Sequence, residues 1–139
     1  MSYHHKLRST VIDISNSADP KEAILKHLAD SLNSIPEIYG NRVLLATYIR
    51  PSKTAGGIWR PDSDIEEDRW TGKVGLVLKI GQQAFENDRD YKWKNPPKVG
   101  DWVTFWTNDT KEIGINGVSC REIRDICIGW ICTKPELYY

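Results

Sequence analysis

The residues with the clearest chemical use form a short polar segment that contains a pair of glycines. In order, the segment consists of Thr54, Ala55, Gly56, Gly57, Ile58 and Trp59. Glycine loses more backbone entropy on ordering than any other residue, so a glycine pair favours mobility or a left-handed backbone. A large apolar side chain, Ile58, follows directly and forms the apolar hook of the loop, the side chain that would contact a partner. A flexible loop that carries such a side chain can become ordered when it binds a partner. The segment predicts a partner-binding loop; the alternative is an ordinary long surface loop.

Residue types that catalyse reactions are poorly placed in this sequence. The three histidines, His4, His5 and His27, all lie within the first 40 residues. A nucleophile needs a base in contact with it, and neither Ser52 nor Ser63 has one beside it in the sequence. We therefore expect a binding protein with no catalytic residues and no cofactor.

An acidic stretch follows the docking segment, with five carboxylates between residues 62 and 68. Carboxylates can bind a hard cation such as calcium, but this stretch lacks the spacing and the closing glycine of an EF-hand loop. A solvated, self-repelling loop is the better interpretation, so we expect no metal site.

Composition sets the class of protein. A chain of 139 residues favours one domain, and its nineteen basic and nineteen acidic residues give no field that would attract nucleic acid or an anionic membrane. No apolar run approaches the roughly 18 residues of a membrane span. The N-terminus lacks the apolar core of a secretory signal, which predicts a cytoplasmic location. Cys120, Cys127 and Cys132 have no CxxC spacing and are expected to be reduced and buried.

One helix is predicted near the N-terminus, over residues 20–33. Asp19 can cap it, Pro20 suits its first position, and Glu22 completes a capping box. Four apolar side chains fall on one helical face: Ile24, Leu25, Leu28 and Leu32. We expect this face to pack on the domain or on a neighbouring subunit.

The remainder of the chain has a β pattern, with strands expected at 42–49, 73–80, 101–106, 112–115 and 122–131. In the second of these, Val74, Leu76, Leu78 and Ile80 alternate and are predicted to share a face. Short strands with irregular turns indicate an all-β barrel or sandwich. The connections at about 50–71 and 82–99 are long, and such loops are usually functional.

Tryptophans predict a further contact. Trp102 and Trp106 share one strand face with Thr104, while Val103 and Phe105 share the other. One set should lie in the core, and we expect Trp102 and Trp106 to contact a neighbouring subunit. The alternatives are the N-terminal helix and solvent.

These motifs, in this order, resemble the GroES family of co-chaperonins. Residues 41–45 resemble its opening strand, residues 53–58 the centre of its mobile loop, and residues 72–81 the strand that leaves the loop. Residues 98–105 and 122–131 resemble a following strand and the closing strand. The resemblance implies a small GroES-like β-barrel at 41–132, after an N-terminal extension at 1–40 that carries the helix and before a tail at 133–139.

The resemblance also implies a function. Subunits of the family form a seven-membered ring that caps a GroEL-type chaperonin through mobile loops, and residues 82–99 would match the hairpin of the roof. Catalysis is not implied. GroES-like barrels also occur in certain dehydrogenases, but this chain has no glycine-rich nucleotide fingerprint and no room for their second domain.

The chain departs from the family pattern in its apolar hook and its length. The family hook is usually three aliphatic residues, whereas here Ile58 is followed by Trp59, Arg60 and Pro61. The N-terminal extension has no counterpart in the short cellular form, and enlarged versions are typical of tailed bacteriophages. We therefore expect a phage-encoded protein in the host cytoplasm that assists the folding of a capsid protein. The alternative is a virion structural protein, a head decoration or cement subunit that binds capsid protein and reuses the fold.

Overall fold

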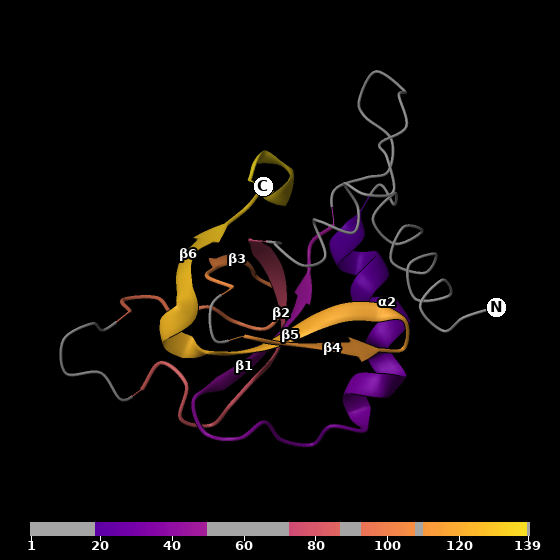
Figure 1. The fold of residues 1–139 in the computed structure, drawn as a ribbon, viewed down its shortest axis with the longest axis horizontal. Helices are drawn as coiled ribbons and strands as arrows, with labels where there is room; N and C mark the ends of the chain where they lie inside the picture. The colour runs from indigo at the N-terminus through magenta and orange to yellow at the C-terminus, as the bar shows by residue number, and fades with distance from the viewer. Residues whose placement is uncertain (1–18, 50–72, 87–92, 108–109, 139) are drawn as a thin grey trace.

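The computed structural model describes residues 19–49, 73–86, 93–107 and 110–138. Its elements, in chain order, are the helix α2 (Pro20–Asn33), the strands β1 (Arg42–Thr47), β2 (Val74–Ile80), β3 (Trp102–Phe105), β4 (Lys111–Ile115) and β5 (Val118–Arg124), the 3-10 turn η1 (Asp125–Cys127), the strand β6 (Ile128–Cys132) and the 3-10 turn η2 (Pro135–Leu137). Over these ranges the fold is mostly β-sheet with one α-helix, as the sequence predicts (Figure 1).

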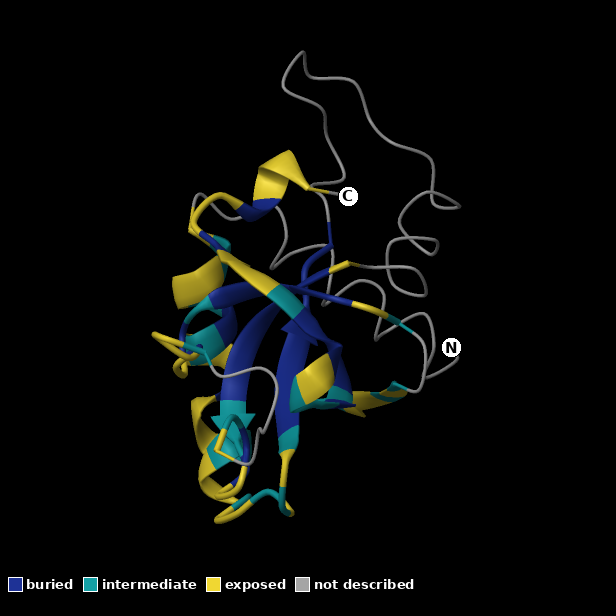
Figure 2. Cartoon of the chain, turned by 90° about the vertical axis from the view of Figure 1, so that its left-hand side faces the viewer, coloured by how far each residue is buried: buried dark blue, intermediate teal, exposed yellow. Residues whose placement is uncertain are grey.

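All six strands belong to one antiparallel sheet with the order β4-β5-β1-β2-β3-β6. The sheet twists strongly and wraps around its inner side chains, consistent with a small GroES-like barrel (Figures 1 and 2). Strands β4 and β6 lie at the two ends of this order, so each has one strand partner within the described residues.

The closing strand predicted at 122–131 is wrong in its extent, because two strands separated by η1 occupy this region. Strand β5 pairs with β1, whereas β6 pairs with β3, so the chain must cross from one part of the sheet to another. The crossing is fixed at Asp125, whose N–H donates to the Asn41 carbonyl at 3.0 Å and whose carboxylate accepts from the Phe85 N–H at 2.8 Å.

The hairpin between β4 and β5 was also missed in part, since β5 begins at Val118 and not at residue 122. The two turn residues, Asn116 and Gly117, have φ angles of 46° and 82°. Left-handed backbone at both positions is typical of a type I′ hairpin turn, for which Asn-Gly is the preferred sequence.

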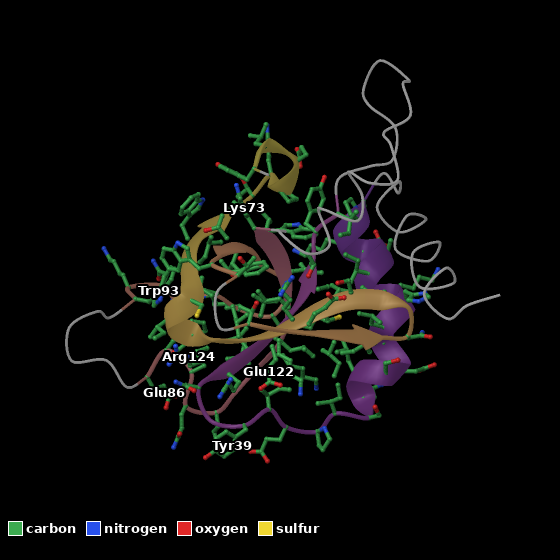
Figure 3. All side chains as sticks on the ribbon, viewed as in Figure 1. Tyr39, Lys73, Glu86, Trp93, Glu122 and Arg124 are labelled. Carbon is green, nitrogen blue, oxygen red and sulfur yellow. The ribbon has the colours of Figure 1, made fainter. Side chains whose placement is uncertain are left out.

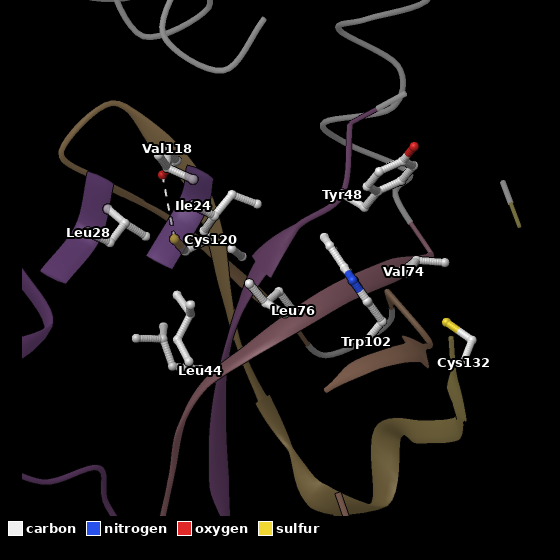
Figure 4. Packing of buried hydrophobic residues seen from close by; sticks show 12 residues of the cluster. Ile24, Leu28, Leu44, Tyr48, Val74, Leu76, Trp102, Val118, Cys120 and Cys132 are labelled. Atoms are coloured by element: carbon white, nitrogen blue, oxygen red, sulfur yellow. Dashed lines mark hydrogen bonds between the residues drawn. The ribbon is translucent and has the colours of Figure 1, made fainter. Parts of the chain in front are cut away.

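The strands β1, β2, β3 and β5 are mostly buried (Figure 2), and the buried side chains of the sheet form two separate apolar clusters. The outer cluster includes Leu44, Leu76 and Leu78 together with two residues of α2, Ile24 and Leu28 (Figure 4). The inner cluster lies on the opposite face and contains Val43, Leu45, Ala84, Val77, Val103, Phe105, Ile123, Cys127 and Ile128.

A register shift in β1 and β2 changes the predicted face of one residue. Leu44 pairs with Lys79 and Leu45 with Val77, so Leu78 is an extra residue in β2. A bulge of this kind breaks the alternation of side chains. Ile80 therefore packs against the inner cluster, while Leu78 stays in the outer one, which corrects the prediction that they share a face.

Helix α2 has the predicted bounds and the predicted cap. The Glu22 N–H donates to the Asp19 carboxylate at 3.2 Å, and Pro20 occupies the first turn. Ile24 and Leu28 are buried against the sheet, so the helix packs on its own domain. His27 borders the buried face, and its Nε2 lies 2.8 Å from the Asn116 carbonyl oxygen at the β4–β5 turn.

Candidate functional site

The predicted docking residues Thr54, Ala55, Gly56, Gly57, Ile58 and Trp59 lie outside the described residues. The structure does describe the two strands between which they lie in the sequence. The Tyr48 N–H donates to the Val74 carbonyl at 2.8 Å, which joins the end of β1 to the start of β2. The chain therefore leaves and re-enters the sheet at neighbouring positions.

The sheet end beneath this exit is rigidly packed. The rings of Tyr48 and Trp102 meet edge to face, with centroids 5.5 Å apart (Figure 4). Trp102 is only 7% exposed and belongs to the outer cluster, so contacts within the subunit account for its burial. The subunit contact predicted for Trp102 and Trp106 stays a prediction, and the Trp106 side chain is 59% exposed.

A polar cluster lies on the inner face of the β4–β5 hairpin. The Arg121 guanidinium donates to Thr110 Oγ1 at 2.9 Å, and the Ser119 hydroxyl donates to a Glu112 carboxylate oxygen at 3.4 Å. Glu112 stands directly opposite Arg121 in the ladder. Burial lowers the pKa of Arg121, and the Glu112 carboxylate opposes that shift. This arrangement stabilises a buried charge.

The cysteines are free and buried, as predicted. Burial and the nearby Glu112 carboxylate raise the pKa of the Cys120 thiol to about 12. Burial, with Glu136, also raises the pKa of Cys132. A thiolate is the reactive form of cysteine, so these thiols are poor nucleophiles near neutral pH.

The described ranges contain no group of three or more His, Cys, Asp or Glu residues that could hold a metal ion. Among the same residues, the one helix is too short and too polar to cross a membrane.

Two grooves meet at Trp106. The first has a volume of about 560 Å³ and is lined by Lys73 and Thr107 with the exposed apolar residues Trp106, Trp130, Leu137 and Tyr138. The second has a volume of about 800 Å³ and is lined by Trp106, Tyr39, Gln83, Phe85, Trp93, Asp125 and Ile126. We call these residues together the aromatic face. Two residues that line its second groove, Tyr39 and Trp93, come from different parts of the chain (Figure 3).

Sequence reasoning found one part of the aromatic face, Trp106, and missed the rest. Trp130 is 52% exposed and Ile126 is 64% exposed. Both lie in the region predicted as a single strand at 122–131. The available signal was the density of apolar residues at 126–131, which exceeds what one face of a short strand can bury.

Comparison with protein families gives one match. Residues 37–126 fit the family model described as "Chaperonin 10 Kd subunit", and this range covers β1 to β5 and the first part of η1. Helix α2 precedes the matched range, while β6 and η2 follow it. A comparison with curated proteins gave no match.

Proposed function

Because this chain belongs to the chaperonin 10 Kd subunit family, we propose that it is a co-chaperonin that caps a GroEL-type chaperonin through the segment 54–59. Family membership supports a co-chaperonin-like activity, a chaperonin partner, ring assembly and a role that is not enzymatic. We take residues 41–132 as the barrel domain, 1–40 as its extension and 133–139 as its tail.

One observation carries the proposal. The docking segment lies inside the matched range, between two strands whose adjoining ends are hydrogen-bonded and packed on a buried aromatic pair. Packed strand ends of this kind fix where a connecting segment leaves and re-enters the sheet. We propose that the segment itself becomes ordered when it binds the partner. Loops that carry binding residues are commonly positioned by a rigid scaffold in this way.

The proposed mechanism is thermodynamic linkage. The segment loses conformational entropy when it docks, which keeps the affinity of one subunit moderate. The nucleotide state of the chaperonin can then decide between capture and release. Several subunits in one ring give an avidity that a single segment lacks. Ile58 and Trp59 supply the apolar contacts. The guanidinium of Arg60 must stay in water or pair with an opposite charge.

The origin and client are further parts of the proposal. We propose a phage-encoded subunit that acts in the host cytoplasm on a capsid protein. Two departures from the family pattern support this origin: the N-terminal extension with helix α2, and the altered hook after Ile58. A second candidate is a virion structural subunit that binds capsid protein. The exposed aromatic residues that follow the matched range, Trp130 and Tyr138, favour it.

The test is ADP-dependent co-sedimentation of the purified protein with a GroEL-type chaperonin. We expect the wild type to be captured and Ile58→Asp to lose capture, because a carboxylate in an apolar groove costs several kcal/mol unless it is paired. Val99→Asp is the matched control, since Val99 is exposed and lies outside the docking segment. Loss of capture in both variants, or in neither, would contradict the assignment of the segment. Failure of the folded wild type to be captured would favour the virion role.

A further inference from the structure

A buried hydroxyl at the end of β1 needs a partner that the neighbouring strands do not supply. Thr47 is the last residue of β1 and is only 3% exposed. Within the part of the chain that the structure describes, its Oγ1 has no hydrogen-bond partner. Leaving a buried hydroxyl unpaired costs free energy, so such groups are nearly always bonded to protein or to ordered water.

The strand register places Thr47 beside other polar side chains. Leu45 belongs to the inner cluster, and Thr47 is two residues further along the same strand, so both side chains point to the inner face. Arg121 of β5 stands directly opposite Leu45. Ser119 is two residues from Arg121, so it lies on the same face and next to Thr47. On its other side Thr47 pairs with Gly75 of β2, which has no side chain to bond it.

The side chains beside Thr47 have hydrogen-bonding capacity for a further molecule. Ser119 is 1% exposed, and its hydroxyl donates to Glu112 at 3.4 Å, which is long for a bond between two oxygens. Its oxygen can also accept a bond. The buried Arg121 guanidinium donates to Thr110 Oγ1 at 2.9 Å, and a guanidinium has five N–H donors in all.

We propose that an ordered water molecule binds on the inner face between Thr47, Ser119 and Arg121. Three polar partners are the usual number for a buried water. A neutral molecule fits this place better than an ion does, because Arg121 and Glu112 bring opposite charges to it. The side toward β2 is closed: a Cβ added at Gly75 would lie 3.0 Å from the Leu45 Cβ, which leaves no room there for a larger ligand.

The water would join two strands at the point where the chain leaves the sheet. Thr47 directly precedes Tyr48, whose N–H donates to the Val74 carbonyl at 2.8 Å. The printed ladder between β1 and β5 ends one residue earlier, at the pair Ala46 and Cys120. A water bonded to Thr47 and to β5 therefore extends the link between these strands by side chains, beyond the last backbone pair.

The test compares full-length Thr47→Val with Thr104→Val. Valine has nearly the shape of threonine, so each change removes little more than a hydroxyl. Thr104 is the matched reference, because it is also buried and its Oγ1 accepts directly from the Trp130 N–H at 3.1 Å. Urea unfolding at one fixed protein concentration gives the stability of each variant. We expect both changes to raise the unfolding equilibrium constant by about two- to tenfold, the usual effect of losing one hydrogen bond.

A second measurement detects the water itself. Water magnetic relaxation dispersion on the folded proteins reports internal waters of long residence. Thr47→Val should have lost such a water relative to the wild type, whereas Thr104→Val should keep it.

Two results would overturn the proposal. One is a Thr47→Val protein at least as stable as the wild type, since the hydroxyl then had no bond to lose. The other is a destabilised Thr47→Val protein with unchanged relaxation dispersion, which would mean that Thr47 bonds directly to the protein in solution. Neither readout involves a chaperonin, so the water site and the co-chaperonin role can fail separately.

Discussion

At the scale of single residues, Asp125 makes contacts that join distant parts of the chain. Its carboxylate accepts from the Phe85 N–H, and Phe85 has a φ of 65°, a left-handed backbone that is unfavourable for a bulky side chain. The Phe85 ring also meets Trp93 edge to face at 6.2 Å, on the wall of the second groove. The hydrogen bond from Phe85 therefore offsets local strain and shapes part of the aromatic face.

We expect Asp125→Ala to lower the free energy of unfolding by about 1–3 kcal/mol, the cost of leaving a partly buried N–H without a partner. Urea denaturation measures the change. Asp125→Asn is the matched control, because its amide oxygen can still accept the hydrogen bond, so it should lose less. Equal stability of Asp125→Ala and the wild type would show that the Phe85 backbone is held by its packing alone.

Cys120 gives a prediction on pH. Its pKa is raised from 9.0 to about 12 in the folded protein, so above pH 9 the unfolded chain loses this proton while the folded chain keeps it. Stability from this group is complete below pH 9 and falls by about 1.4 kcal/mol per pH unit above it, up to the folded pKa. Cys120→Ala should lack this component. The measurement is the slope of unfolding free energy between pH 9 and 10.5 in both proteins, and parallel slopes would contradict the prediction.

At the scale of elements, the helix α2 is part of the barrel's own core. Leu28 is fully buried in the outer cluster although α2 lies outside the range that matches the family. The helix also meets the β4–β5 turn, where the Asn116 side-chain amide donates to the His27 carbonyl at 3.4 Å. Removing residues 1–40 would therefore expose core leucines of β1 and β2, in addition to any effect on assembly.

We expect Leu28→Ala to destabilise the protein by about 2–5 kcal/mol, the usual range for truncating a buried leucine. Lys26→Ala, on the exposed side of the same helix, should change stability by no more than about 0.5 kcal/mol. Thermal unfolding of the two variants compares the effects. A Leu28→Ala protein as stable as Lys26→Ala would mean that the helix contributes little to the core.

Local signals explain why the sequence predicted some elements well and others poorly. The bounds of α2 follow from neighbouring residues, with Asp19 and Pro20 at its start. The break at η1 has no such signal, because it depends on contacts of Asp125 with residues 40 and 84 positions away. The exposure of Trp106 and Trp130 was equally hidden, since α2 covers one part of the outer sheet face and leaves these residues uncovered. The docking segment rests on sequence alone, because its residues lie outside the described part of the chain.

At the scale of the whole molecule, the proposed ring would join the docking segments of several subunits. The segment 54–59 would bind the partner weakly in each subunit, and the ring would present several such segments at once. If several segments of one ring must engage at once, their contributions multiply and do not simply add. A ring with a few defective segments should then bind much more weakly than its fraction of intact segments indicates.

Mixed rings test this dependence. Wild type and Ile58→Asp are co-refolded in stepped ratios, and capture by the chaperonin is measured by co-sedimentation in ADP. We expect capture to fall more steeply than the wild-type fraction, because each lost segment lowers the avidity of the whole ring. Mixtures of rings assembled separately are the control, and their capture should fall in proportion to the wild-type fraction. A proportional fall in the co-refolded rings would mean that each subunit binds the chaperonin on its own, and it would contradict the avidity mechanism.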